Sequence, residues 1–285
     1  MMSWRIEGLL KTKGSIERNI YMKIIRLFTL IIMLTSCSKS PKVLYQELPP
    51  DEFKSRLAEC PVAYLPLGTL EWHGDHLPLG SDGLQSAGFF KILAEEAGGI
   101  VMPMLFIGPD GYDTIINGRE YYGMDCASLF SEQGNYEIQQ LPGSAYWVPD
   151  STFDIMMNGI MKQLSRAGFK IVVAHGHGPS TNYIGANIRV FKEKYNLVVM
   201  NCWGDDRDDI CLMCDHAGAN ETSIMMYLHP DLVHMEKLPA DTSVWPKGML
   251  GKDPRIHASR ERGKVIIDFE VEKMKEIIRK ELERL

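Results

Sequence analysis

The sequence lacks the features with which a protein binds nucleic acid. Lys and Arg number 31 against 37 Asp and Glu in 285 residues, which gives a formal net charge of -6. No basic stripe occurs beyond the N-terminal segment, and a polyanion is bound by clustered Lys and Arg. The remaining composition, 45% hydrophobic and 24% charged, is ordinary for a soluble globular protein. We therefore expect a small-molecule partner and no nucleic acid.

Several familiar motifs are also missing. The 6 Cys residues show no framework spacing. Cys211 and Cys214 form a lone C-x-x-C, whereas a structural zinc site of that type needs a second pair. That motif therefore indicates either two semi-buried thiols or one local disulfide. The H-E-x-x-H helix of zinc peptidases is absent, as are internal repeats and low-complexity segments.

The apolar run near the N-terminus is too short to span a bilayer comfortably, which takes about 20 residues. It follows the basic residues Lys23 and Arg26, covers residues 27–34 and ends in the sequence LTSC at Cys37. A short basic region followed by an apolar stretch and small residues is typical of a signal peptide. Small residues directly before Cys also resemble the lipobox of bacterial lipoproteins.

We expect Cys37 to become the lipidated first residue of the mature chain. The protein would then lie in the bacterial cell envelope, anchored to the membrane and facing the periplasm. An ordinary signal peptide or a buried helix is the alternative. Residues 1–21 would be an extension upstream of a start at Met22. We divide the chain into an N-terminal extension, signal and tether over residues 1–42 and a folded domain over residues 43–285.

Helical and strand patterns alternate along that domain. Charged and apolar residues at helical spacing predict helices, and continuous apolar runs bounded by Pro or Gly predict buried strands. The predicted helices cover 51–59, 82–97, 151–168, 182–195 and 221–229, and the predicted strands cover 61–68, 98–108, 169–178 and 196–203. Strands that are apolar on both faces predict a mostly parallel sheet covered on both sides by helices, which is an α/β fold.

Three other segments have simpler interpretations. Asp150 or Ser151 is the expected cap of the helix over 151–168. Residues 111–149 show no regular pattern, so we interpret them as an insertion near the carboxyl edge of the sheet that forms a lid or a subunit contact. The charge pattern of residues 271–285 predicts a solvated final helix.

Chemically active side chains gather in three clusters, each just past a predicted strand. The clusters are EWHGDHLPLGSD at 71–82, AHGHGPSTN at 174–182 and DHAGANETS at 215–223. In open parallel sheets ligands bind outside the carboxyl ends of the strands. Clusters on separate strands can therefore converge on one crevice, as a metal site requires.

The first cluster has the residue types of a metal site. Glu71 and His73 are two residues apart, so on an extended segment their side chains point the same way and can bind neighbouring ions. Asp82, at the start of the next predicted helix, has two oxygens with which it could bridge those ions. Taken alone, such residues could also satisfy the backbone of a turn.

The other two clusters add candidates with open alternatives. His177 follows its strand among glycines that let the backbone approach a ligand closely. We interpret His175 as a core histidine. Glu221 near a helix start is either a charge that complements the helix dipole or a ligand. His216, among small residues, is free to act on a substrate.

The three clusters together resemble conserved blocks of the creatininase family. LPLGTLEWHGDHLPLGSD resembles that family's PxGxxExHGxHLPxxTD block, GHGPSTN its NGHGGN block, and DHAGANETSIMMYLHPDLVHM its HAGxxETSxMLxxxPxLV block. The similarity covers roughly residues 43–285. It implies a dinuclear metallohydrolase with a three-layer α/β/α fold, commonly hexameric, that cleaves C–N bonds of cyclic amides, formamides or modified peptides. Some relatives act on oxidised cyclitols.

The resemblance also implies a ligand set. Carried over by position, Glu71, Asp82 and His177 would bind one ion, and His73, Asp82 and a second carboxylate would bind the other. In creatininase itself that carboxylate lies two residues after the equivalent of His177.

The chain departs from the family at that position, where it has Pro179. Glu221 could supply the missing ligand, or the second site could be weaker. His175 replaces the usual Asn, and the three residues Pro179, Ser180 and Thr181 stand in place of a Gly before Asn182. These departures lie beside the expected ions, so the substrate is expected to differ from creatinine.

The expected reaction is metal-dependent hydrolysis. Two divalent ions can hold a bridging water, lower its pKa and polarise a substrate carbonyl. Zinc suits a mixture of His and carboxylate, with manganese or iron as alternatives. His216 is the expected acid for the leaving nitrogen, and Glu221 could share that role if it is not a ligand. The alternatives are a hydrolase of an oxidised cyclitol or keto-sugar and an inactive small-molecule-binding lipoprotein.

Overall fold

The structure is a computed structural model that describes residues 42–109, 113–202, 210–212 and 214–285. These residues belong to one compact unit, Lys42–Leu285. The predicted signal segment and Cys37 lie outside the described residues, so the lipid anchor stays a prediction. Among the helices of the described part, none combines the length and the apolar character needed to cross a membrane.

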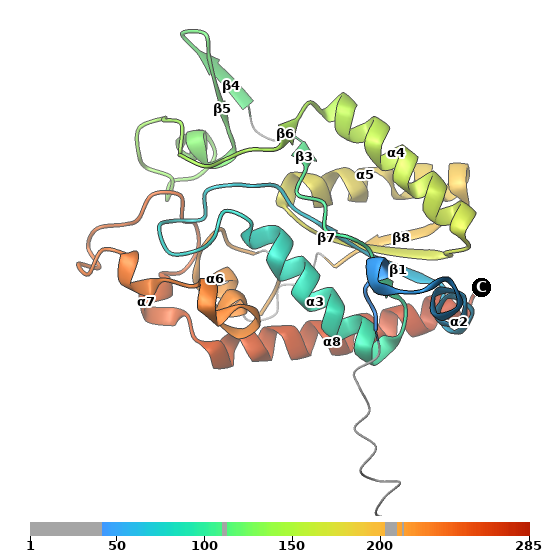
Figure 1. Cartoon of the computed structure of the whole chain (residues 1–285). Helices are drawn as coiled ribbons and strands as arrows, with labels where there is room; N and C mark the ends of the chain where they lie inside the picture. Colours follow the sequence, from blue (N-terminus) through green and yellow to red (C-terminus); the bar gives the residue numbers. More distant parts are fainter. Residues whose placement is uncertain (1–41, 110–112, 203–209, 213) are drawn as a thin grey trace, which may run out of the picture. The chain divides into compact units, whose positions relative to one another are not determined.

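A four-stranded parallel sheet forms the centre of this unit, in the order β2-β1-β7-β8 (Figure 1). Its middle strands β1 and β7 are buried along their whole length and pair from Val62 with Ile171 to Leu67 with Gly176. This matches their apolar sequences VAYLPL and IVVAHG. The strands are β1 Val62–Leu67, β2 Ile100–Val101, β7 Ile171–Gly176 and β8 Val198–Asn201.

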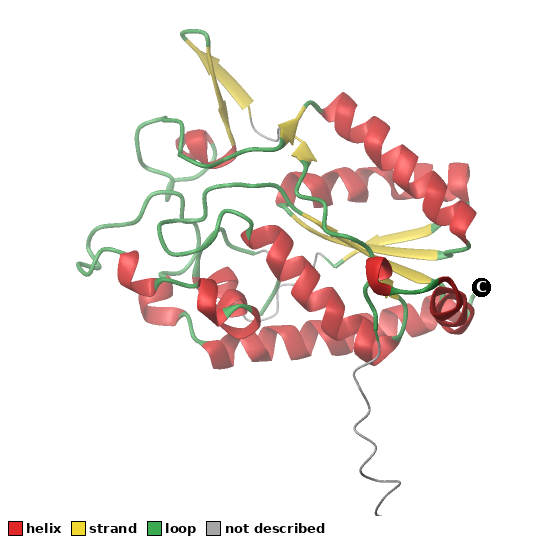
Figure 2. Ribbon diagram, viewed as in Figure 1, coloured by secondary structure: helices red, strands yellow, loops and turns green. Residues whose placement is uncertain are grey.

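Helices cover both faces of the sheet (Figure 2). On one face α4 and α5 bury Phe153, Met157 and Phe191 against Leu65 and other residues of one core cluster. On the other face α3, α6 and α8 form a second core cluster. The predicted three-layer α/β/α fold is therefore confirmed. The helices are α2 Pro50–Glu59, α3 Ser81–Ala97, α4 Asp150–Ala167, α5 Gly178–Tyr195, α6 Ala219–Leu228, α7 Pro254–His257 and α8 Arg260–Leu282, and the 3₁₀ turns are η1 Tyr45–Glu47, η2 Gly123–Leu129, η3 Pro230–Leu232 and η4 Met235–Lys237.

The predicted strand over residues 98–108 is mostly irregular. Regular pairing ends after the two residues of β2. Pro103 follows directly and has no N–H to donate to a ladder. Beyond it, single hydrogen bonds still hold the chain beside β1, because Leu105 O accepts a hydrogen bond from the N–H of Gly68 at 2.9 Å.

The final helix is longer and more buried than predicted. The prediction placed a solvated helix at 271–285, but α8 begins at Arg260 and one of its faces lies in the core. It also crosses α6 closely at Gly263, where an added Cβ would lie 1.9 Å from Ser223 O. The solvated interpretation was therefore wrong. The buried residues of α8 are Gly263, Ile266, Ile267, Glu270, Val271, Met274 and Ile278.

The insertion and the residues just before it contain short regular elements. The pair β3 (Gly108–Pro109) and β6 (Trp147–Val148) is parallel, whereas β4 (Asp113–Ile116) and β5 (Arg119–Tyr122) form an antiparallel hairpin. The predicted cap of α4 was wrong, because Pro149 occupies the N-cap and no side chain caps the helix. Asp150 is instead the first helical residue, where its charge complements the helix dipole.

The C-x-x-C motif forms the local disulfide that was one of its two interpretations. Cys211 is bonded to Cys214. Cys60, Cys126 and Cys202 are buried and form no disulfide within the described part of the chain. The disulfide directly precedes the third cluster of the sequence, so it lies at the start of one of the segments that build the site.

Candidate metal centre

The candidate ligands lie where the carboxyl ends of β1 and β7 meet. The two strands are parallel neighbours, so the segments that follow Leu67 and Gly176 leave the sheet at the same edge. Gly176 has φ 147°, and an added Cβ would lie 1.5 Å from Leu67 O. Only Gly fits this close approach. His177 comes next, as the N-cap of α5.

Helix starts bring the remaining carboxylates to the same edge. Asp82 lies in the first turn of α3, and Glu221 lies in the first turn of α6. Both side chains are buried, as are those of Glu71, His73 and His177. The structure thus brings together all five of the residues predicted as ligands.

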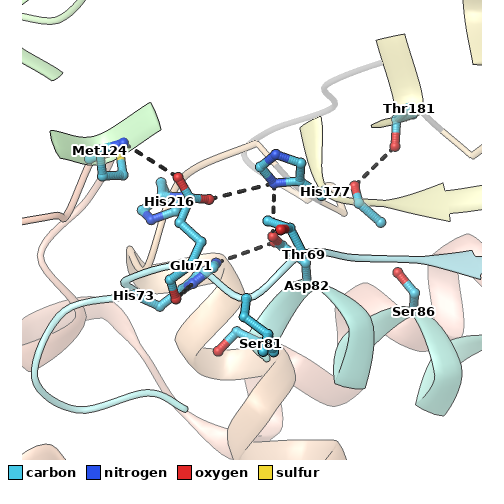
Figure 3. A network of polar contacts seen from close by, with 12 residues as sticks. Thr69, Glu71, His73, Ser81, Asp82, Ser86, Met124, His177, Thr181 and His216 are labelled. Carbon is cyan, nitrogen blue, oxygen red and sulfur yellow. Dashed lines mark hydrogen bonds and ion pairs between the residues drawn. The ribbon is translucent and has the colours of Figure 1, made fainter. Parts of the chain in front are cut away.

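Asp82 is the centre of this group (Figure 3). Its Oδ1 lies 3.3 Å from His73 Nε2, and its Oδ2 lies 3.1 Å from His177 Nδ1. Each histidine also faces a second carboxylate. His177 Nδ1 lies 3.5 Å from Glu71 Oε2, and His73 Nε2 lies 3.7 Å from Glu221 Oε2. One carboxylate therefore joins two His–carboxylate pairs.

Three overlapping sets of side chains have the geometry of a metal site. Within each set, one ligand atom per residue lies within 4.8 Å of the others. The sets are Glu71, Asp82 and His177; His73, Asp82 and Glu221; and Glu71, His73 and His216. The first two share Asp82 and match the two ligand sets that the resemblance implied, with Glu221 as the second carboxylate.

Hydrogen bonding prepares His73 for coordination. Its Nδ1 lies 3.0 Å from the backbone oxygen of Glu71, which can only accept a hydrogen bond. The proton of a neutral ring is therefore held on Nδ1. The lone pair of Nε2 then faces Asp82 and Glu221, as in metal sites where the other ring nitrogen donates to a carbonyl.

The charges of the group also fit a cation. Burial raises the pKa of Glu71 and, more strongly, the pKa of Glu221. Burial lowers the pKa of His73, but the charge and hydrogen bond of Asp82 and the charge of Glu221 outweigh it and raise that pKa to about 10. The carboxylates therefore draw a proton onto the ring nitrogen that faces them. A divalent ion would supply that positive charge instead.

One oxygen of the group also lacks a partner. Glu221 Oε2 accepts a hydrogen bond from the N–H of Ala217 at 2.7 Å, whereas Oε1 has no hydrogen-bond partner in the described part of the chain. A buried carboxylate oxygen without a partner is costly, and a metal ion would satisfy it. The set of two His nitrogens and three carboxylates suits zinc or manganese.

His216 lies beside the ligands in a different setting. Its ring stacks on that of His73, with centroids 4.2 Å apart. Its Nε2 donates a hydrogen bond to the backbone oxygen of Trp72 at 2.7 Å, so Nδ1 carries the lone pair, 4.0 Å from Glu71 Oε2. Burial and the neighbouring His73 lower the pKa of His216 to about 3. The ring is therefore neutral in the metal-free protein, with its lone pair on Nδ1.

Two of the residues that depart from the family blocks, His175 and Pro179, lie in different places. His175 is buried against Phe89 and Phe90 and shares a hydrogen bond with Ser86 at 2.8 Å. This agrees with its interpretation as a core histidine. Pro179, in contrast, lines a cavity together with four of the candidate ligands: Glu71, Asp82, His177 and Glu221.

This cavity has a volume of about 610 Å³. Besides the ligands, its walls include residues that the sequence patterns did not single out. Met124 and Trp147 come from the insertion, and the N–H of Met124 lies 3.4 Å from Glu71 Oε1. The Trp147 ring meets that of His177 edge-on, with centroids 5.1 Å apart. No periodicity marks these residues in the sequence.

Asp215 is a further residue that the sequence patterns did not single out. Its carboxylate accepts hydrogen bonds from the N–H groups of Asn220 at 2.7 Å and Glu221 at 3.1 Å. It therefore holds the first turn of α6, which carries Glu221. An acid shortly before a predicted helix is the usual sign of such a cap, and that sign was present in the sequence.

Comparisons with known proteins agree with this arrangement. Residues 46–118 and 130–278 match the model of the creatininase family, described as creatinine amidohydrolase. Creatinine amidohydrolase of Pseudomonas putida is 26% identical over 279 residues, which cover 85% of this chain and 98% of that protein. Mycofactocin precursor peptide peptidase of Mycolicibacterium smegmatis is 25% identical over 179 residues, 62% of each chain.

Solved structures of creatininase have the same fold. A zinc–zinc form of a creatininase variant has a TM-score of 0.62 and 27% identity, over 86% of this chain and 99% of that chain. A manganese form has a TM-score of 0.61 and 26% identity, over 84% and 98%. The family model covers most of the sequence, and the residue groups described above can bind metal. The chain therefore belongs to the creatininase family and is a metal-dependent amidohydrolase.

Proposed function

We propose that the protein binds two divalent metal ions, with zinc as the preferred metal. Glu71, Asp82 and His177 would hold one ion, and His73, Asp82 and Glu221 would hold the other. The observation that carries this proposal is the position of Asp82, whose two oxygens face two different histidines. Glu221 thus takes the place of the carboxylate that the chain lacks at Pro179.

The proposed reaction is hydrolysis of a C–N bond in a small cyclic amide or formamide. When bound, the ions supply an activated water and polarise the carbonyl to be attacked. His216 lines the same cavity and has an unprotonated Nδ1. It would accept a proton there and pass it to the leaving nitrogen. Glu221 would then act as a ligand, with no role in proton transfer.

Asp82→Ala provides the test of this function. The variant should lose bound zinc and hydrolytic activity together, because both proposed ions depend on this carboxylate. Asp75→Ala is the matched control, since Asp75 is an exposed acid in the same loop. It should keep both properties. Zinc content would be measured by elemental analysis, and turnover would be measured with a panel of lactams and formamides.

Two other functions remain as alternatives within the same site. A hydrolase of an oxidised cyclitol or keto-sugar would turn over keto-sugars in that panel and leave lactams intact. An inactive binding lipoprotein would bind zinc and turn over neither class. The match to a family described as creatinine amidohydrolase favours an enzyme over a binding protein.

We also propose that the protein is a homo-oligomer, anchored by a lipid at Cys37 and facing the periplasm. The sequence LTSC at the end of the N-terminal apolar run supports the anchor. Exposed apolar side chains on and beside the insertion support a subunit contact, among them Ile115 at 66% exposure and Tyr146 at 63%. Sedimentation of the purified protein should give a mass several times that of one chain.

A further inference from the structure

The walls of the catalytic cavity differ in chemistry. The polar part of the lining includes four of the candidate ligands, Glu71, Asp82, His177 and Glu221, together with His216 and Asp215. Apolar side chains from distant parts of the chain line other parts of the wall: Met124, Phe130 and Trp147 from the insertion, Pro179 from α5, and Leu250. The polar groups would hold the scissile amide, and the apolar side chains offer contacts to the rest of a substrate.

Charge restricts the substrate further. The described lining residues include four carboxylates, those of Glu71, Asp82, Asp215 and Glu221, and no Lys or Arg. Two divalent ions would balance these four negative charges without any excess of positive charge. A carboxylate or phosphate on the substrate would therefore find no cationic side chain among them, and its desolvation would be uncompensated.

The size of the cavity argues against a single small ring as the whole substrate. Its volume of about 610 Å³ lies in the middle of the range of about 300 to 1,000 Å³ that is usual for ligands of drug size. Phe130 lies directly after η2 and is 38% exposed, although it is a large apolar side chain. A ligand group packed against it would cover this surface.

We propose that the substrate is an uncharged or cationic amide that carries an apolar group of ring size, and that Phe130 is a specificity residue contacting this group. The proposal rests on the metallohydrolase function proposed for the same cavity. Burial of one aromatic ring against such a wall should tighten binding about 10- to 100-fold.

Three hydroxamic acids test this proposal without any need for turnover. Hydroxamates chelate zinc, and acetohydroxamate, phenylacetohydroxamate and succinic monohydroxamate differ only in the group that they carry. Calorimetry on the zinc-loaded full chain should give a dissociation constant for phenylacetohydroxamate that is about 10- to 100-fold lower than for acetohydroxamate. Succinic monohydroxamate should bind no more tightly than acetohydroxamate.

Three variants test whether Phe130 causes the tighter binding of phenylacetohydroxamate. Phe130→Ala should reduce the advantage of the phenyl group, the ratio between the dissociation constants of acetohydroxamate and phenylacetohydroxamate, to about threefold or less. The dissociation constant of acetohydroxamate itself should stay within about twofold of wild type. Phe130→Leu, which keeps most of the apolar surface, should restore part of the advantage. Leu129→Ala is the matched control, because Leu129 is 55% exposed and does not line the cavity. It should keep the full advantage.

The outcomes separate this proposal from the function on which it rests. If acetohydroxamate and its phenyl analogue both fail to bind the zinc-loaded protein, the metal centre itself is refuted, and the proposal with it. If both bind equally, or if Phe130→Ala keeps the full advantage, only the specificity proposal is overturned. Tighter binding of succinic monohydroxamate would overturn the inference drawn from charge.

Discussion

Two histidines of the site have stacked rings but different partners. His73 directs Nε2 at two carboxylates, whereas His216 donates from Nε2 to a backbone oxygen and leaves Nδ1 without a proton. His216 also belongs to one set that could bind metal, together with Glu71 and His73. Its nearest carboxylate oxygen is 4.0 Å away, whereas the proposed ligands His73 and His177 lie 3.1 to 3.7 Å from the carboxylates around them. This difference favours proton transfer for His216.

Replacing His216 tests that role. His216→Ala should keep zinc near the wild-type level and lower turnover by about 10²- to 10⁴-fold, the usual range for one positioned proton donor or acceptor. His229→Ala, which removes a histidine outside the cavity, should change neither property. Elemental analysis and rate assays on both variants decide the point. Loss of zinc from His216→Ala would make that residue a ligand and leave Glu221 as the proton carrier.

His73 predicts how pH acts on the metal-free protein. Its pKa is about 10 in the folded state and about 6.5 in an unfolded chain. The folded state therefore holds a proton that the unfolded chain has lost between these values, so stability falls as pH rises from 6.5 to 10. The melting temperature of metal-free protein should be lower at pH 9 than at pH 7.

Two comparisons test whether His73 causes this pH dependence. The melting temperature of zinc-loaded protein should fall less between pH 7 and pH 9, since the ion replaces the proton on the ring. Metal-free His73→Gln should also show a smaller fall than metal-free wild type. A fall of equal size in all three samples would assign the effect to groups elsewhere in the chain.

The packing of helix α8 against helix α6 supports the part of the site that α6 carries. Helix α6 carries Glu221, and Gly263 of α8 lies against its backbone at Ser223. Gly263→Ala should lower the free energy of unfolding by about 1 to 3 kcal/mol, because the added methyl group meets backbone that cannot yield easily.

Gly159→Ala is the matched helix control, since an added Cβ there has no atom within 4 Å. It should raise the free energy of unfolding by up to about 1 kcal/mol through the higher helix propensity of Ala. Chemical denaturation of both variants measures the difference. Equal stability of the two would mean that the helices separate at no cost.

The elements also show where sequence patterns succeed and fail. Strands β1 and β7 were predictable because continuous apolar runs end in Gly or His at the sheet edge. The burial of α8 was missed because the apolar stripe begins before residue 271. Ile267 lies on the same buried face as Met274 and Ile278, but it precedes the segment 271–285 on which the prediction rested.

At the scale of the whole molecule, the candidate ligands were predictable and the cavity walls were not. The ligands follow strand ends or open helices, and parallel topology gathers such positions at one edge. Met124, Phe130 and Trp147 reach the cavity through contacts between segments far apart in sequence, such as the hydrogen bond from Trp147 Nε1 to Leu70 O. Irregular segments carry no periodicity that would reveal such contacts.

The proposed anchor also concerns the whole chain. Cells grown with a fatty-acid analogue should label the wild-type protein and leave Cys37→Ser unlabelled, because acylation needs the thiol that follows LTS. Cys126→Ser, which removes a buried thiol of the folded unit, should be labelled like the wild type. Equal labelling of wild type and Cys37→Ser would rule out lipidation at this residue.

The most direct test of the central claim is anomalous scattering at the zinc edge from crystals of the zinc-loaded protein. The account predicts two peaks per chain. One should be bound by Glu71 and His177, the other by His73 and Glu221, with Asp82 bound to both. A single peak, or a second peak coordinated by His216 in place of Glu221, would contradict the account.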